Sequence, residues 1–309
     1  MSTGGIRIER NPRWLGAADY VSFLNRAFPR QWNRAAYDWY IARPFLGTAN
    51  DTLVVTEGRR VLAGITVCHR QVGNDASGPV NVGALCAGAT LGSERGRGHY
   101  GRLLEAAREL AVMKGYAALL GFVTRDNASG RGLARRGARA IASFYITSVP
   151  GRGPGSRRSY GRGLSQPEAV TAAFTASAPS RGSCVRFLYA RAGDWQRQFI
   201  DRPNPVRALR LAHDSLALLE AVEGTDRLQW LACPREKVGA SIASLASASI
   251  AAGRQFFLYT LDALVAAAAA RAGLKSRAGC LMLWPTGHRS DAWESIANAP
   301  WTVQSGDRV

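Results

Sequence analysis

The sequence predicts an α/β fold of the mixed α+β kind, in which helices flank a mixed sheet. It also predicts that this fold is built as two tandem domains. Three observations support this prediction. Short apolar and β-branched runs alternate with segments whose apolar residues recur at helical spacing. A basic stretch at residues 150–165 carries almost no aliphatic side chains and divides the chain. The order of elements before this stretch is echoed after it. We therefore expect one domain over residues 1–165, ending in this linker or flap, and a second over residues 166–309.

The first half opens with helical and aromatic segments and continues with strands. Apolar residues at helical spacing predict a helix within residues 14–28, and an aromatic-rich segment then runs to Pro44. Residues 51–70 indicate two strands joined by the turn sequence EGRR. Residues 80–92 predict a long strand. Its high glycine content indicates a bulge or a close approach of another group to the backbone.

A glycine- and arginine-rich loop follows this strand, in the sequence SERGRGHYGRLLEA at residues 93–106. The apolar residues after it lie on one face of a helix, and Gly115 is a plausible stop. Residues 116–124 then predict a buried strand, residues 125–138 a short polar helix or loop, and residues 139–149 the last strand of this half.

The second half resembles a diverged copy of the first. The tetrapeptide I-A-R-P at residues 41–44 recurs as I-D-R-P at residues 200–203. The helix and strand that end at residue 124 are echoed by residues 243–263, with Gly253 opposite Gly115. This order and spacing favour an internal duplication.

Charge and cysteine content narrow the function classes. The net charge is +18, and residues 1–165 hold 24 basic against 10 acidic residues. Such a field attracts polyanions such as coenzyme phosphates, an acidic carrier protein or RNA. Arginine supplies nearly all of the excess, so high-GC coding is an alternative explanation for part of it. The five cysteines are scattered and odd in number, which argues against a disulfide framework or a zinc site and suits a cytoplasmic protein. We expect no membrane span, because no uncharged apolar stretch is long enough.

The glycine-rich loop has the properties of a phosphate site. A strand, a glycine turn and a helix start direct unpaired N–H groups and the positive helix end toward one spot. The loop is not a P-loop, because no G-K-[ST] follows the glycines. It is not a dinucleotide fingerprint either, because it follows three or more strands.

In this context SERGRGHYGRLLEAA resembles the acyl-CoA-binding signature of the GCN5-related N-acetyltransferase (GNAT) superfamily, R/Q-x-x-G-x-G/A at the end of the fourth strand. Asn127 and Gly137 agree with the family's downstream pattern. The resemblance covers about residues 50–147 and reaches the second half only through the repeat. It implies two GNAT-like domains, each with a mixed, largely antiparallel central sheet flanked by helices. The second domain would be degenerate, because CPREKVGAS stands where the loop should be.

The resemblance also implies a co-substrate, acetyl-CoA or another acyl-CoA, without a metal. Its pyrophosphate would contact Arg95, Gly96, Arg97, Gly98, His99, Tyr100 and Gly101. Thr90 and Leu91 would lie beside the pantetheine arm, with Asn127 on the side of the next strand.

Two departures from the family pattern concern the chemistry. Tyr100 stands where the signature has a small residue, and Ala134 stands where a tyrosine usually protonates the leaving thiolate. Tyr145 and Tyr160 are candidate substitutes for this acid. His69 is a candidate base, although a lone histidine is more often structural. A further set of aromatic side chains suits either an acceptor pocket or a helix packed on the sheet: Trp32, Tyr37, Trp39 and Tyr40.

The sequence therefore predicts a cytoplasmic acyl-CoA-dependent N-acyltransferase of class EC 2.3.1, in the first place an N-acetyltransferase. Its acceptor would be an amine of a small molecule or peptide, and a homodimer is compatible with this reading. One alternative is an acyltransferase whose anionic partner is an acyl carrier protein or an aminoacyl-tRNA. Another is a non-catalytic module that senses CoA or binds nucleic acid, which the absent tyrosine at position 134 motivates.

Overall fold

A computed structural model describes residues 5–29, 32–75, 78–149, 161–177, 184–212, 215–287 and 290–308. Most of the expected basic flap, including Tyr160, lies outside these residues. Within them the strands form one sheet of 13 strands, in the order β1-β2-β3-β4-β5-β13-β6-β12-β11-β10-β9-β7, with β8 paired to β3. None of the helices in these ranges is both long and apolar enough to cross a membrane.

The first half supplies the strands β1 (Ile6–Arg10), β2 (Asp51–Glu57), β3 (Arg60–Gly73), β4 (Val80–Thr90), β5 (Ala118–Thr124) and β6 (Arg139–Thr147). Its helical segments are α1 (Ala17–Ala27), α2 (Arg34–Tyr37), the π-helical turn η1 (Asp38–Ala42), the 3-10 turn η2 (Gly92–Glu94), α3 (His99–Met113) and α4 (Ala128–Ala134). These elements follow the order that the sequence predicts.

The second half supplies the strands β7 (Arg162–Gly163), β8 (Arg186–Phe187), β9 (Val206–Arg210), β10 (Leu216–Val222), β11 (Thr225–Ala232), β12 (Gln255–Thr260) and β13 (Lys275–Pro285). Its helical segments are α5 (Gln166–Ser177), α6 (Ala192–Phe199), η3 (Arg235–Lys237), α7 (Val238–Ala251), α8 (Ala263–Arg271), α9 (Asp291–Ala297) and η4 (Ser305–Asp307). The order β11-α7-β12-α8-β13 repeats the order β4-α3-β5-α4-β6 of the first half.

The helices cover the sheet on both faces and bury its apolar side chains. In the first half, α3 and α4 pack on one face through residues such as Leu104 and Leu133, while α1, α2 and η1 cover the other. In the second half, α7 and α8 pack against β10, β11 and β12, and α5 and α6 against the other face. Gly115 and Gly253 follow α3 and α7 with φ of +67° and +71°, the left-handed conformation that ends a helix.

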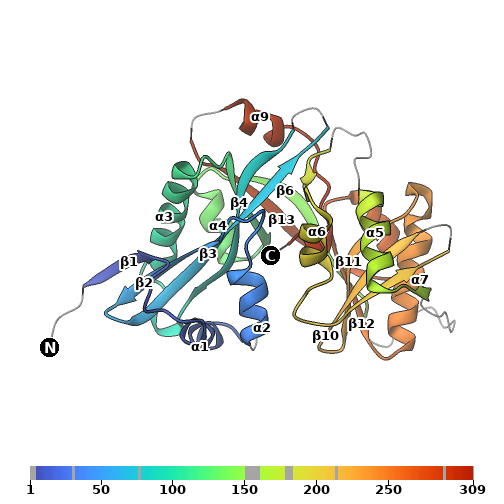
Figure 1. Cartoon of the computed structure of the whole chain (residues 1–309), viewed down its shortest axis with the longest axis horizontal. Helices are drawn as coiled ribbons and strands as arrows, with labels where there is room; N and C mark the ends of the chain where they lie inside the picture. The colour runs from blue at the N-terminus through green and yellow to red at the C-terminus, as the bar shows by residue number, and fades with distance from the viewer. Residues whose placement is uncertain are drawn as a thin grey trace.

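The two halves exchange their last strands: β13 of the second half pairs with β5 of the first, and β6 of the first half pairs with β12 of the second. The last strand of the second half, β13, lies between β5 and β6, with Pro285 opposite Ala118 and Lys275 opposite Thr147. The strand β6 in turn pairs with β12. Figure 1 shows β13, in red, among the green strands of the first half, and the C-terminus near the middle of the molecule. The exchange pairs both edges of β6 and β13, so neither half presents an open edge there.

Candidate coenzyme site

The strands β4 and β5 pair in parallel over a short stretch and then separate. Their register runs from Val82 opposite Ala118 to Ala84 opposite Leu120 and goes no further. Beyond Ala84, β4 keeps its bonds to β3 and β5 keeps its bonds to β13, so the edges that face each other carry unpaired N–H and C=O groups. The expected bulge is present on β4. Gly64 lies opposite Ala89 and Thr66 lies opposite Cys86, so the register of β3 and β4 shifts between these pairs.

A cavity of about 250 Å³ lies where the strands separate. It is lined from both strands and from β3, from the segment between α1 and α2 and from η1, and from α3 and α4. The lining residues are Phe28, Trp32, Tyr40, Ile65, Leu85, Cys86, Ala87, Gly88, Tyr100, Gly121, Phe122, Val123, Asn127, Ser129 and Leu133. Of the four aromatic side chains for which an acceptor pocket was considered, Trp32 and Tyr40 line this cavity, whereas Tyr37 and Trp39 do not.

The glycine-rich loop lies at the end of β4 and exposes its backbone. Gly96 and Gly98 have φ of +82° and +78°, and a Cβ atom at either would meet nothing within 4 Å. Helix α3 begins directly afterwards, and its first intrahelical bond is donated by Arg102 to the Gly98 carbonyl. Within the described chain, no hydrogen bond is donated by the backbone N–H groups of residues 96–101. These groups, at a positive helix end, form the cradle that the sequence predicts for an anion.

The buried carboxylate of Glu94 holds this loop through ion pairs. It is 5% exposed and forms ion pairs with Arg60 at 3.0 Å and with Arg97 at 3.2 Å. The buried His99 ring lies 3.6 Å from the same carboxylate. The His99 side chain therefore faces Glu94, and its backbone N–H is the group that remains for a phosphate. The sequence gives little sign of this role, because the residues next to Glu94 in the chain do not distinguish it from an exposed glutamate.

Tyr100 and Asn127 both reach the cavity. A Cβ atom on Gly88 would lie 2.9 Å from Cε2 of Tyr100, so the tyrosine ring covers a bare stretch of β4. Burial raises the pKa of Tyr100. Asn127 caps α4, since its Oδ1 accepts from the Ser129 N–H at 2.8 Å. Thr90 and Leu91 lie beside β3, with Thr90 opposite Ala63, and neither lines the cavity.

The two predicted catalytic residues lie away from the cavity lining. His69 pairs across the sheet with Gly83, and its Nδ1 lies 3.2 Å from the Tyr116 hydroxyl. Burial, with the charges of Arg70 and Lys114, lowers the pKa of His69 and favours the neutral ring that a base needs. The Tyr145 ring packs on Tyr259 at 5.0 Å between centroids. Tyr259 in turn packs on Phe122 of the cavity wall.

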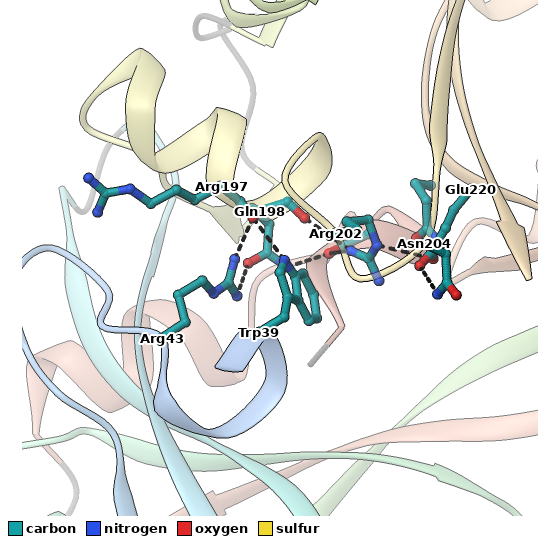
Figure 2. Close-up of polar contacts among 9 residues, drawn as sticks. Trp39, Arg43, Arg197, Gln198, Arg202, Asn204 and Glu220 are labelled. Carbon is teal, nitrogen blue, oxygen red and sulfur yellow. Dashed lines mark hydrogen bonds and ion pairs between the residues drawn. The ribbon is translucent and has the colours of Figure 1, made fainter. Parts of the chain in front are cut away.

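The arginines of the two I-x-R-P segments both pack on Trp39, at the contact between the halves (Figure 2). Trp39 and Arg43 both donate to the carbonyl of Arg197, at 3.0 and 2.8 Å. The guanidinium carbons of Arg43 and Arg202 lie 4.2 and 4.1 Å from the centroid of the Trp39 ring. Arg202 is fixed by an ion pair with the buried Glu220 at 3.1 Å. The duplication signal thus marks a contact that joins the halves.

Neither a protein-family model nor a curated protein sequence matches the chain. Solved structures do match it over nearly its whole length. It is similar to a tandem GNAT protein from the clavulanic acid biosynthesis pathway, with a TM-score of 0.61, 15% identity and coverage of 92% of this chain and 100% of that one. A GCN5-related N-acetyltransferase from Sphaerobacter thermophilus matches with a TM-score of 0.59, 13% identity and coverage of 92% and 97%. One from Kribbella flavida matches with a TM-score of 0.58, 16% identity and coverage of 91% and 71%.

The chain therefore has the GNAT fold in its tandem form. This confirms the fold and the resemblance to the GNAT superfamily that the sequence predicts, whereas the degeneracy of the second domain stays a prediction.

Proposed function

We propose that the protein is an acyl-CoA-dependent N-acyltransferase, in the first place an N-acetyltransferase, whose coenzyme binds in the first half. The observation that carries this proposal is the continuity of three features. An exposed N–H cradle at the start of α3 leads into a strand separation with unpaired edges, and this separation opens into the cavity. A nucleotide thioester has the matching order of a pyrophosphate, an arm with amide groups and an acyl group.

Each part of the chain would act on a separate part of the coenzyme. The N–H groups of residues 96–101, with Arg95 and Arg97 beside them, would hold the pyrophosphate. The unpaired edges of β4 and β5 would bond to the amides of the pantetheine arm, as an added strand does. The aromatic lining from Trp32, Tyr40 and Phe122 would exclude water from the thioester.

The reaction needs an amine without its proton, and a group that returns a proton to the leaving thiolate. His69, with its lowered pKa, remains the candidate base, and Tyr145 remains the candidate acid. Since neither side chain lines the cavity, each would act through a water molecule or through the acceptor itself.

Calorimetric titration with acetyl-CoA, a longer acyl-CoA and free CoA tests the proposal, with Gly98→Trp as the disrupting variant. The indole would fill the cradle, and we expect the dissociation constant for acetyl-CoA to rise about 100-fold or more. Gly224→Trp is the matched control, because Gly224 has φ of +76°, equally open space and a place in the second half. It should bind like the wild type. Equal affinity in wild type and Gly98→Trp would refute the assignment of the loop.

The same titrations at low and high salt separate the proposal from its alternatives. Binding of acetyl-CoA that persists at high salt supports a specific coenzyme site. Absence of coenzyme binding, with salt-sensitive binding of an acyl carrier protein or a tRNA, would favour a macromolecular anionic partner. Binding of acetyl-CoA without turnover of any amine would favour a coenzyme-sensing module.

A further inference from the structure

Arg70 on β3 is a buried charge that lacks an acidic partner. Its side chain is 1% exposed, and no carboxylate in the described residues lies within ion-pair distance of it. Nη1 donates to the carbonyl of His69 at 2.6 Å, and Nε has no partner. A guanidinium has five N–H donors and stays protonated, so burial with one bond to the protein is strongly unfavourable. Buried ionisable groups with strongly unfavourable surroundings are concentrated at functional sites, where a ligand can supply the missing charge.

Arg70 lies on the face of the sheet that carries the aromatic lining of the cavity. It is opposite Val82 on β4 and shares its face with Cys68, two residues earlier on the same strand. The Cys68 thiol donates to the carbonyl of Tyr40, whose side chain lines the cavity. The Arg70 guanidinium lies 5.0 Å from the centroid of the Phe45 ring. The charge of Arg70 also reaches the cavity wall. Cys68 and burial raise the pKa of Cys86, and the charge of Arg70 acts in the opposite direction.

The surroundings of Arg70 carry an excess of positive charge. Burial, followed by the charge of Arg70, lowers the pKa of Arg43 to about 9. Asp307 is the acid in the field of Arg70, and its carboxylate is already engaged. Oδ1 accepts from the Tyr189 hydroxyl at 2.6 Å, and Oδ2 accepts from the Gln304 N–H at 2.7 Å. Arg202 also acts on Arg43 and Asp307, but its charge is balanced by Glu220. Arg43 and Arg70 against Asp307 then leave one positive charge for a ligand.

The coenzyme phosphates are too far away to supply this anion. The cradle follows Thr90 at the end of β4, whereas Arg70 lies opposite Val82 near its start. Eight residues of a strand span roughly 25 Å. An anion at Arg70 would therefore come from the other substrate and not from the coenzyme phosphates.

We propose that the acceptor is an amine that also carries a carboxylate, and that Arg70 binds this carboxylate. The inference rests on the proposed N-acyltransferase function and names its substrate class. A monoanion fits better than a phosphate dianion, because Asp307 lies in the same neighbourhood and would repel a second negative charge. Arg70 is then the residue that selects amino acids over simple amines.

Pairs of acceptors that differ by the carboxylate test this inference on the wild-type chain. The pairs are glycine with methylamine, β-alanine with ethylamine, and ornithine with putrescine, and the readout is CoA release from acetyl-CoA. We expect the carboxylated member of a pair to have a kcat/KM about 100-fold higher, because a buried charge left unpaired is costly. Equal values within the pairs would overturn the inference. A preference for phosphoethanolamine over β-alanine would overturn the assignment to a carboxylate.

Arg70→Met provides a readout that does not depend on turnover. Thermal unfolding is followed with acetate or propionate against chloride at constant ionic strength, and separately with acetyl-CoA. We expect the carboxylates to raise the Tm of the wild type but not that of Arg70→Met, while acetyl-CoA raises both. Arg186→Met is the control, because Arg186 already pairs with Asp75 at 2.7 Å. It should keep the carboxylate response.

The two experiments separate the failure of each proposal. If acetyl-CoA binds neither variant nor wild type, the proposed function fails, while a carboxylate response lost in Arg70→Met still supports the anion site. If acetyl-CoA binds and the carboxylate response is absent or unchanged in Arg70→Met, the inference fails alone. If Arg70→Met does not fold, the paired acceptors and the carboxylate response of the wild type decide the question.

Discussion

The separation of β4 from β5 in the first half and that of β11 from β12 in the second share a backbone plan, but different groups lie between the strands. The second pair is parallel from Thr225 opposite Gln255 to Leu228 opposite Leu258 and then separates, as the first pair does. In the first half, the space beyond leads to the N–H cradle. In the second half, residues 302–305 of the chain itself line a cavity of about 150 Å³ there.

Polar side chains fix this segment between the separated strands. The Gln304 amide accepts from the Leu231 N–H at 3.3 Å and donates to the Leu231 carbonyl at 3.1 Å. The Ser305 hydroxyl accepts from the Tyr259 N–H at 2.6 Å and donates to the Tyr259 carbonyl at 3.2 Å. These bonds satisfy the strand edges that the first half leaves open. One scaffold thus has open strand edges in the first half, where we propose that a ligand binds, and strand edges closed by the chain itself in the second half.

Removal of the segment should have the largest effect on this comparison. A chain that ends at Trp301 loses the Gln304 and Ser305 bonds and the buried Val303, and we expect the free energy of unfolding to fall by about 4 kcal/mol or more. Urea unfolding followed by tryptophan fluorescence measures this change. An excess of the peptide TVQSGDRV should restore stability by mass action, whereas a scrambled peptide should not. An unchanged midpoint would show that the segment is dispensable.

Gly306→Ala should displace the same segment without removing it. A Cβ atom there would lie 2.4 Å from Cε1 of Phe199 and 3.0 Å from the Gln229 carbonyl oxygen, so the chain must move. We expect a loss of about 3 kcal/mol in the free energy of unfolding. Gly193→Ala in α6 is the matched control, because its Cβ would meet nothing within 4 Å. A similar midpoint for both variants would contradict close packing at Gly306.

Asp307→Asn should give the smallest effect, which depends on pH. Burial raises the pKa of Asp307 from 3.8 to about 6, so between these values the folded state binds the proton more tightly than the unfolded state. The contribution of Asp307 to stability therefore falls as the pH rises through this window. Relative to the wild type, the variant should gain about 2 kcal/mol between pH 4 and pH 6. Chemical unfolding across this range measures the difference. A constant difference would contradict the raised pKa.

Much of the fold could be predicted because its signals are local. The apolar period of α3, the hairpin over residues 51–70 and the stop at Gly115 depend on neighbouring residues, and the structure has all three. The N–H cradle could be predicted for the same reason, since Gly96 and Gly98 stand next to the helix that they precede.

The strand exchange and the site partners depend on contacts that are distant in sequence. β6 and β13 have the pattern of buried strands wherever they lie, so their apolar residues do not specify which neighbour they pair with. The segment at residues 302–305 is short and has no period, although two side chains hold it in the sheet. Arg70 looks like the polar end of a strand in the sequence, and its burial depends on contacts such as that with Phe45, which is 25 residues away in the chain.

The exchanged strand has a consequence for synthesis on the ribosome. The strand β5 ends at Thr124, but β13, which pairs with it, ends only at Pro285. At about 5–20 residues per second, roughly 8 to 32 s pass between the two. During this time the nascent first half exposes a hydrophobic strand edge that β13 has not yet covered. We expect the proposed coenzyme site to form only after nearly the whole chain has been translated. We also expect chaperones to bind the nascent chain mainly in this interval.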